Sequence, residues 1–340
     1  MSNVLIGVDL GTTNIKIFDQ SSNKILKEKN VIAIANKKDL FAYGDEAYEM
    51  HEKAPANISV TFPVHYGVIA DYNNMQMLIN EFLKKLGEDK GKYADFIVAV
   101  PTDITEVEKK AFRDLVKGCS VKSKNVLVAD KPVAAAIGLG LDVKAPTGTL
   151  LVDMGGETSE ISVLSLGGIV LSQLNQIGGN KLDESIISYV KKTYGTDIGK
   201  KTACTLKENI GTALLVEGEM EEMKAFGRNI VSGLPCQITL TSEDIYNAII
   251  ENINSLINAI KMLLERIPPE LSADIINHGL YLTGGASQIK NLDKLLTQEL
   301  NIGVNITEEP TESVVRGLVQ IATNSKFQSL AYTSSTKKLD

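Results

Sequence analysis

Residues 9–16 read DLGTTNIK, and they directly follow the apolar run VLIGV at residues 4–8. A second copy of the pattern, DMGGETS at residues 153–159, follows GTLLV at residues 148–152. Each copy joins a buried strand that ends in an acidic residue to a turn of glycine and hydroxyl residues. The backbone N–H groups and hydroxyls of such a turn can surround a phosphate from one side. The repeat therefore predicts two phosphate-binding hairpins.

The residues of these hairpins divide into metal carboxylates and phosphate donors. Asp9 and Asp153 end the two strands, and each is placed to reach a phosphate-bound Mg²⁺ through water, because Mg²⁺ keeps several waters and takes few carboxylates directly. The predicted nucleotide-binding residues of the turns are Gly11, Thr12, Thr13, Asn14, Gly155, Gly156 and Thr158. The expected ligand is a Mg-nucleotide held by both turns.

A single D-x-G-T is as readily an ordinary tight turn, because short glycine motifs often match by chance. The duplication weakens that alternative, and so do three further segments. They are VAVP at the end of a strand (residues 98–101), the small-residue helix PVAAAIGLG (132–140) and LTGGAS after an apolar strand (282–287). Together they favour a phosphate clamp over a bare turn.

Length and composition bound the class of protein. A chain of 340 residues fits two domains of about 150 to 170 residues each. With 44% hydrophobic and 23% charged residues and no long apolar run, a soluble globular protein is expected. A strand that starts near residue 4 leaves no room for a secretory signal. The spacing of the three cysteines suits neither disulfides nor a zinc site: Cys119, Cys204 and Cys236. We therefore expect a cytoplasmic protein. The net charge of −7 argues against a nucleic-acid surface.

Hydrophobic periodicity predicts a similar order of elements in both halves. In the first half it predicts strands at 4–8, 15–18, 96–100 and 126–128, helices at 73–86, 104–117 and 131–139, and a segment up to about residue 72 that breaks the rhythm. In the second half it predicts strands at 148–152, 160–164 and 169–174, a helix at 181–193, an irregular insertion to about 240, and a long helix opened by Thr241 or Ser242. The fold class is a duplicated α/β domain, whose ligands bind beyond the carboxyl ends of the strands.

These motifs resemble the MreB family of bacterial actins, within the actin and heat-shock chaperone ATPase superfamily. Further blocks that match in the family's order are GVIAD (67–71), VEKKA (107–111), AAAIGLG (134–140), IGG (177–179), YG (194–195), PPEL (268–271) and NLD (291–293). The resemblance spans residues 4 to about 322. It implies duplicated actin-like (ribonuclease H-like) domains, with four subdomains around a cleft for ATP or ADP and Mg²⁺.

The same resemblance implies a division into domains. Domain I would be residues 1–142 with a small subdomain at about 31–72, and domain II residues 143–322 with a small subdomain at about 180–240. Residues 323–340 would be a flexible C-terminal tail.

The resemblance also carries ligand and partner expectations. Lys207 and the loop formed by Gly284, Gly285 and Ala286 match nucleotide-contacting positions. Polar homopolymers are implied, grown by head-to-tail contacts that do not close and arranged as double filaments. Other MreB paralogues are further candidate partners.

The catalytic region departs from the family's pattern. Lys131 stands where the family has the glutamate that orients the attacking water, and an ammonium group only donates. Because loss of a positioned base costs about 10² to 10⁴ in rate, we expect weak ATP hydrolysis. Two alternatives are that Asp130 substitutes from one residue earlier, although an N-cap role suits it better, and that Lys131 is merely solvated and the base comes from elsewhere.

The second hairpin departs too. Glu157 replaces a glycine of the family's D-x-G-G-G-T turn and brings bulk and negative charge toward the phosphates, whereas Thr158 keeps the hydroxyl that supports hydrolysis. Catalytic residues altered in this way are similar to those of divergent MreB paralogues from wall-less bacteria, whose filaments serve helical shape and motility.

Membrane attachment has little support in the sequence. The loop at residues 87–95 offers one aromatic residue among charges and would bury little apolar area. The tail, with Phe327, Leu330 and Tyr332 before Lys337 and Lys338, is the alternative contact.

Three functions compete. The first is a cytoskeletal filament subunit that binds ATP and hydrolyses it poorly; the second is a pseudo-ATPase regulator that does not polymerise. The third is a sugar kinase or chaperone on the same fold, which would need a catalytic aspartate and sugar pocket or a peptide-binding domain for which the sequence gives no sign. The matching family blocks favour the first.

Overall fold

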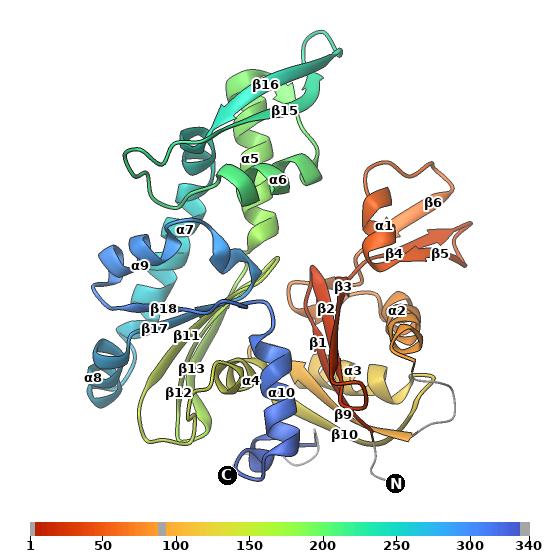
Figure 1. The fold of residues 1–340 in the computed structure, drawn as a ribbon, viewed down its shortest axis with the longest axis vertical. Coiled ribbons are helices and arrows are strands. Elements are labelled where there is room, and N and C mark those ends of the chain that lie inside the picture. The colour runs from red at the N-terminus through yellow and green to blue at the C-terminus, as the bar shows by residue number, and fades with distance from the viewer. Residues whose placement is uncertain (1–3, 88–92, 334–340) are drawn as a thin grey trace. The chain divides into compact units, whose positions relative to one another are not determined.

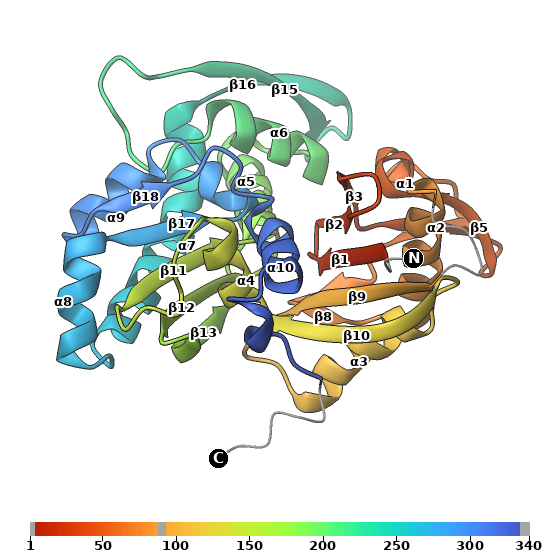
Figure 2. The same cartoon turned by 60° about the horizontal axis from the view of Figure 1, so that its bottom comes forward.

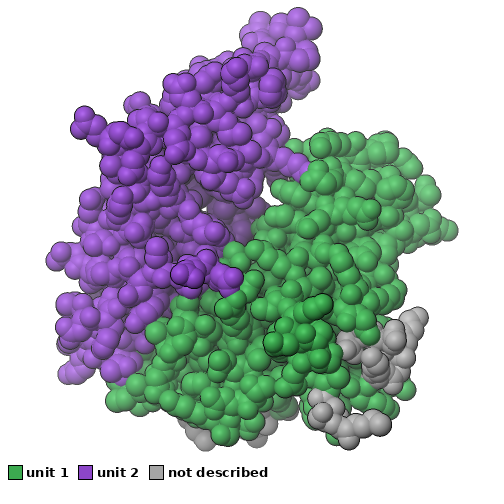
Figure 3. Space-filling model, in the orientation of Figure 1, with its two compact units in different colours: residues 1–146, 164–169, 311–340 green, residues 147–163, 170–310 purple. Residues whose placement is uncertain are grey.

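The computed structural model describes residues 4–87 and 93–333, and the chain forms two compact units (Figure 1), coloured separately in Figure 3. Unit 1 comprises residues 1–146, 164–169 and 311–340, and unit 2 comprises residues 147–163 and 170–310. The division into domains at residues 142 and 322 stays a prediction. Among the described residues, no helix combines the length and the apolar character needed to cross a bilayer.

The main sheet of unit 1 has five strands in the order β10-β9-β1-β2-β3. The bounds are Val4–Leu10 for β1, Asn14–Asp19 for β2, Lys24–Lys29 for β3, Tyr93–Val100 for β9 and Lys122–Asp130 for β10. Strands β1, β9 and β10 run parallel, so their carboxyl ends meet at one edge of the sheet. Strands β2 and β3 are antiparallel to their neighbours.

Helices α2 (Tyr72–Lys85) and α3 (Glu106–Lys117) belong to this unit, and Figure 2 shows α3 beneath β9 and β10. The apolar face predicted for α2 is confirmed, because all five of its members are fully buried: Met75, Leu78, Ile79, Phe82 and Leu83. They pack with the β1, β2 and β9 side chains in one core cluster.

Helices α4 (Lys131–Gly138) and α10 (Ser313–Thr323) pack together through their glycines. A Cβ on Gly138 would lie 1.8 Å from the Ser313 carbonyl oxygen, and one on Gly317 would lie 1.7 Å from that of Ala134. The backbones of the two helices therefore touch where no side chain fits. Through this contact α10, although it comes late in the chain, belongs to unit 1.

The segment before α2 that breaks the α/β rhythm forms a small sheet with strand order β5-β4-β6. Its elements are β4 (Ile32–Ala35), β5 (Asp39–Tyr43), α1 (Gly44–Met50) and β6 (Ile58–Thr61), followed by the short pair β7 (Val64–His65) and β8 (Val68–Ile69). It has its own small core around Val31, Ala33, Ala42 and Ala47.

Unit 2 repeats the main sheet in the order β18-β17-β11-β12-β13. The bounds are Thr149–Met154 for β11, Ser159–Ser165 for β12, Gly168–Asn175 for β13, Leu280–Thr283 for β17 and Val304–Ile306 for β18. Strands β11, β17 and β18 are parallel, as β1, β9 and β10 are. The predicted duplication of the α/β plan is confirmed.

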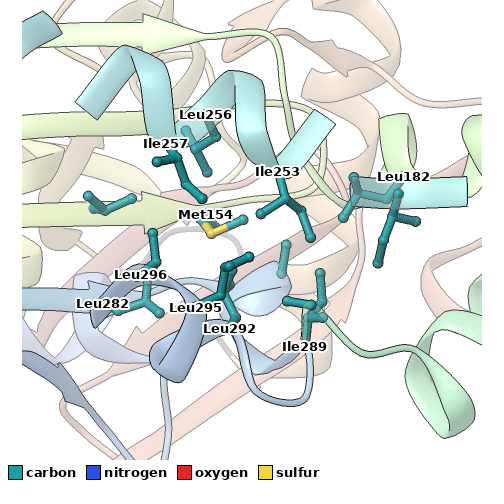
Figure 4. Close-up of a cluster of buried hydrophobic side chains, with 14 of the residues drawn as sticks. Met154, Leu182, Ile253, Leu256, Ile257, Leu282, Ile289, Leu292, Leu295 and Leu296 are labelled. Carbon is teal, nitrogen blue, oxygen red and sulfur yellow. The ribbon is translucent and has the colours of Figure 1, made fainter. Parts of the chain in front are cut away.

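Unit 2 includes the helices α5 (Gly179–Tyr194), α7 (Ser242–Leu264), α8 (Pro269–His278) and α9 (Leu292–Leu300). Helix α5 begins at Gly179, two residues before the predicted start. Of the two candidate caps for α7, Thr241 is the N-cap, and it forms a capping box with Asp244. Figure 4 shows Met154 of β11 enclosed by Ile253 and Ile257 of α7 and by leucines of α9.

The insertion predicted to be irregular is regular in the structure. It contains α6 (Lys200–Ile210) and a sheet of β14 (Thr196–Asp197), β15 (Glu222–Asn229) and β16 (Pro235–Thr241). Along β15 and β16 exposed residues alternate with less exposed ones, so one face of the hairpin is covered. Cys236, Ile238 and Leu240 carry this period of two in the sequence of β16, which is the signal that sequence reasoning missed.

The C-terminal residues after α10 lie against unit 1 as far as residue 333. Phe327 is buried, and Tyr332 forms a two-way backbone bridge with Val128 at the edge of β10. Two of the apolar residues considered for membrane contact are therefore engaged with the protein itself. Lys337, Lys338 and most of the loop at 87–95 lie outside the described residues, and Tyr93 at its end is exposed.

Candidate functional site

The first hairpin connects β1 to β2 through residues 11–13, and its register places Asp9 opposite Lys16. The Lys16 Nζ lies 3.0 Å from Asp9 Oδ2, and the two side chains are only 12% and 4% exposed. The carboxylate predicted to face Mg²⁺ thus already has a buried cation beside it. Sequence reasoning missed Lys16. The available signal is that Asp9 and Lys16 flank the hairpin turn symmetrically, so an antiparallel pairing brings the acid opposite the base.

A buried asparagine fixes the backbone of this turn. The Asn30 Nδ2 donates to the Gly11 carbonyl oxygen at 2.8 Å, and the Asn30 N–H donates to the Thr13 carbonyl oxygen at 2.9 Å. A Cβ on Gly11 would lie 2.6 Å from the Asn14 carbonyl oxygen, so only glycine fits. The protein itself therefore holds the backbone of this turn.

The Thr13 hydroxyl of the same turn is buried and has no hydrogen-bond partner in the protein. Buried polar atoms are normally paired, and an exception calls for an explanation. A phosphate oxygen would supply the acceptor that this hydroxyl lacks. This observation fits the predicted nucleotide site.

The second hairpin connects β11 to β12 through a turn that the Gly155 N–H closes by donating to the Thr158 carbonyl oxygen at 2.8 Å. The start of α5 packs against this turn from behind. The N–H groups of Gly179 and Asn180 donate to the Gly155 and Gly156 carbonyl oxygens at 3.0 and 2.6 Å. These two hydrogen bonds hold the peptide carbonyls of the turn in place. In unit 1 the side chain of Asn30 has the same role.

Glycine is required where α5 meets the turn. A Cβ on Gly178 would lie 2.6 Å from the backbone carbon and 2.7 Å from the nitrogen of Glu157. Glu157, the residue that replaces the family's glycine, thus has its backbone locked against Gly178 and keeps its side chain part-exposed. The glutamate is accommodated by the fold of the turn.

The loop after β17 lies beside the same turn, because Thr283 pairs with Asp153. Gly284 has a φ of 91°, and a Cβ there would lie 2.4 Å from Asp153 Oδ1 and 2.3 Å from the Met154 carbonyl oxygen. The short helix η1 (Gly285–Gln288) follows, with Ala286 buried near Gly179. The structure therefore brings the predicted residues Asp153, Gly155 and Gly284–Ala286 together within unit 2.

Lys207 of α6 reaches the same place from the other side. Its Nζ donates to the Gly179 carbonyl oxygen at 2.9 Å and to Asp183 Oδ1 at 2.7 Å. Burial raises the pKa of Asp183, and Lys207 opposes that rise. Burial likewise raises the pKa of the Cys204 thiol to about 11. An ammonium group has three donors, so Lys207 has capacity for a further acceptor.

Lys131, the first residue of α4, directly follows β10. Because β1, β9 and β10 are parallel, it lies at the same edge of the unit 1 sheet as the turn at 11–13. Asp130 is the N-cap by position, but the prediction of a capping side chain is wrong: it makes no capping hydrogen bond, and Asp130 Oδ1 accepts from the Tyr332 hydroxyl at 2.7 Å instead.

Neither unit has a dedicated metal cage among the described residues, since they contain no group of three or more His, Cys, Asp or Glu side chains suited to an ion. A Mg²⁺ ion that binds with phosphates needs only one or two carboxylates. Asp9 and Asp153, each at a carboxyl edge beside a phosphate-type turn, meet that requirement.

Comparisons with known proteins give matches along almost the whole chain. Residues 3–329 match the family described as MreB/Mbl protein. The cell shape-determining protein MreB of Escherichia coli is 37% identical over 319 residues, which cover 92% of this chain and 91% of that protein. The cell shape-determining protein Mbl of Bacillus subtilis is 38% identical over 315 residues, covering 92% and 93%. The crystal structure of MreB 5 of Spiroplasma citri bound to AMPPNP superposes with a TM-score of 0.92 at 30% identity, covering 97% of this chain and 98% of that one.

Proposed function

This chain belongs to the MreB/Mbl family, and we propose that it is an actin-like cytoskeletal protein that binds Mg-ATP, polymerises, and hydrolyses ATP slowly. Its filaments would govern cell shape or, in a wall-less cell, motility. The proposal that the chain binds a nucleotide depends on the turn of the first hairpin, where a hydrogen-bonded backbone presents a buried Thr13 hydroxyl without an acceptor.

The nucleotide would be bound by groups from both hairpins. In unit 1 these are the turn residues Gly11–Asn14, with Asp9 toward Mg²⁺. In unit 2 they are Gly155, Gly156 and Thr158, with Asp153 toward Mg²⁺, Lys207, and the loop Gly284, Gly285 and Ala286. MreB 5 of Spiroplasma citri has been crystallised with AMPPNP and with ADP, which supports this ligand class. Bound Mg²⁺ would neutralise phosphate charge.

Slow hydrolysis follows from residue 131. A water that attacks a phosphate needs an acceptor for its proton, and the Lys131 ammonium offers only donors. Asp130, the carboxylate next to it, already accepts from Tyr332. The site therefore has the means to bind a nucleotide and lacks the expected base.

Polymerisation is supported by the cell shape-determining relatives and by the whole-chain likeness in fold. In a filament-forming ATPase, nucleotide binding drives assembly and hydrolysis times disassembly, so a slow hydrolase should form long-lived filaments. The alternative is a regulator that binds nucleotide and does not polymerise.

Two measurements test the proposal. Millimolar Mg-ATP should raise the thermal midpoint, because a ligand that binds only the folded state stabilises it; Asp153→Asn should reduce the shift, and EDTA serves as control. Sedimentation at micromolar protein should then give pellets with both ATP and a non-hydrolysable analogue. An unchanged midpoint refutes nucleotide binding. Binding without pellets would select the regulator.

A further inference from the structure

The segment at residues 325–333, here called the C-terminal strap, pairs with the outer edge of the unit 1 sheet at one residue of β10, Val128. The Tyr332 N–H donates to the Val128 carbonyl oxygen and the Val128 N–H donates to that of Tyr332, both at 2.9 Å. β10 is the end strand of its sheet, so the strap supplies partners that the sheet does not. A segment from the far end of the chain thus pairs with the strand that leads into α4.

The side chain of Tyr332 reaches the end of that strand. Its hydroxyl donates to Asp130 Oδ1 at 2.7 Å, and Asp130 is 9% exposed. Burial, and secondly the charge of Asp130, raise the pKa of the Tyr332 phenol, so the hydroxyl stays a donor at all ordinary pH. Asp130 is the last residue of β10 and directly precedes Lys131.

The strap has anchors of its own. Lys326 Nζ lies 2.8 Å from Asp142 Oδ2, and Lys144 Nζ donates to Ser329 Oγ at 2.8 Å. Phe327 is buried, and Leu330 packs over Gly167, whose Cβ position would be 3.0 Å from Leu330 Cδ2. Because several contacts hold the strap, Tyr332 is held at the junction independently of its own hydroxyl.

The first turn of a helix lacks intrahelical partners for its N–H groups, so its start depends on the residues that precede it. We propose that Tyr332 is a positioning residue for the junction between β10 and α4, and that the C-terminal strap thereby sets where residue 131 stands. The consequence for catalysis rests on the proposed function, in which residue 131 occupies the water-orienting place.

Unit 2 offers a control of the same chemistry. The Tyr194 hydroxyl donates to Asp244 Oδ1 at 2.8 Å, and Asp244 lies in the first turn of α7. Burial and this bond raise the pKa of Tyr194 to about 12. Tyr194→Phe therefore removes one tyrosine–aspartate bond at another helix start, where Asp244 Oδ1 still accepts from the Tyr189 hydroxyl at 3.2 Å.

Hydrogen exchange tests the positioning without any nucleotide. In Tyr332→Phe, peptides that cover Val126–Ile137 should exchange about tenfold faster than in the parent, because a hydrogen bond to a charged group is lost. In Tyr194→Phe the same peptides should keep the parent's rate, while those at the start of α7 should lose protection. Parent-like exchange at the junction in Tyr332→Phe overturns the proposal.

A second arm measures catalysis in the Lys131→Glu background. Adding Tyr332→Phe should lower kcat about tenfold and leave KM within about twofold, because the base is misplaced while the ligand contacts remain. Adding Asp130→Asn, which keeps an oxygen acceptor for the phenol, should leave kcat close to that of Lys131→Glu. An equal loss in Asp130→Asn would assign the effect to the aspartate charge and reject the positioning role. If the parent binds no Mg-ATP at all, the proposed function fails, and the exchange result alone decides the role of Tyr332.

Discussion

The two hairpins occupy equivalent places in equivalent sheets, yet different means hold their turns. Both follow the central strand of a five-stranded sheet whose order repeats between the units. In unit 1, side chains fix the turn: Lys16 pairs with Asp9, and Asn30 bonds to the turn backbone. In unit 2, backbone packing fixes it, with Gly178 and Gly284 so close that neither could carry a Cβ.

This difference determines which substitutions each hairpin tolerates. A turn held by side chains depends on their charges and hydrogen bonds, which a substitution removes one at a time. A turn held by close backbone contact depends on the absence of side chains around it. Unit 2 accepts Glu157 within its turn because the Glu157 side chain stays part-exposed, while its backbone makes the contact with Gly178.

The largest expected effect concerns residue 131, at the carboxyl edge of the unit 1 sheet. Lys131→Glu should raise steady-state phosphate release about 10-fold or more, up to the general-base range of about 10² to 10⁴. The physical reason is that a carboxylate accepts the proton of the attacking water, which an ammonium cannot do. Release would be measured at saturating Mg-ATP and equal filament mass.

The control for this prediction lies in the other hairpin. Under the proposed function both hairpins bind one nucleotide, so Glu157→Gly should increase the gain when combined with Lys131→Glu, because two carboxylates near one ligand would raise each other's pKa and weaken binding of Mg-ATP. The combined effect should then exceed the product of the single effects. If the double variant is as slow as the parent, the lysine is not the cause of slow turnover.

The second effect breaks the side-chain support of unit 1. Lys16→Met leaves the Asp9 carboxylate buried without its cation and should lower the free energy of unfolding by about 3 to 5 kcal/mol. Urea unfolding would measure it. Lys109→Met is the matched control. Lys109 Nζ also lies 3.0 Å from a carboxylate oxygen, that of Glu106, but the Glu106 side chain is 73% exposed and so stays solvated without its partner. Such a pair contributes about 0 to 1 kcal/mol.

The double variant Asp9→Asn with Lys16→Met tests the cause. Removing both charges should recover much of the lost stability, since no uncompensated charge then remains buried. A double variant as unstable as Lys16→Met alone would show that the Lys16 side chain stabilises the fold by packing and not by its charge.

The sequence predicts the repeated hairpins because their residues are local and dictated by backbone geometry. It also predicts the buried face of α2 and most strands, since periodicity reports burial. It does not predict the bond from Tyr332 to Asp130, which joins residues 202 positions apart. Nor does it predict the pair of Lys207 with Asp183, because a charged residue on a helix gives no sign of its partner on another.

The third effect concerns the backbone support of unit 2. Gly178→Ala should lower the free energy of unfolding by about 1 to 3 kcal/mol, because the new methyl group overpacks against the backbone of Gly156 and Glu157. Gly303→Ala is the control, since a Cβ at Gly303 meets nothing within 4 Å. Calorimetry gives the thermal unfolding midpoint of both variants. Equal midpoints would show that the turn at residues 155–158 shifts to accept the new methyl group without loss of stability.

The smallest effect separates binding from folding. Thr13→Val replaces a buried hydroxyl that has no partner in the protein, so the stability of the nucleotide-free protein should stay equal or rise slightly. The affinity for Mg-ATP should fall about 5- to 10-fold, because the donor offered to a phosphate oxygen is gone. The matched change in the other hairpin, Thr158→Val, should lower affinity as well and should also slow phosphate release in the Lys131→Glu background, because this hydroxyl is assigned to both binding and hydrolysis. Titration calorimetry and phosphate release on both variants make the comparison. If Thr13→Val binds as tightly as the parent, the unpaired hydroxyl does not contact the ligand, and the hairpin of unit 1 contributes through its backbone alone.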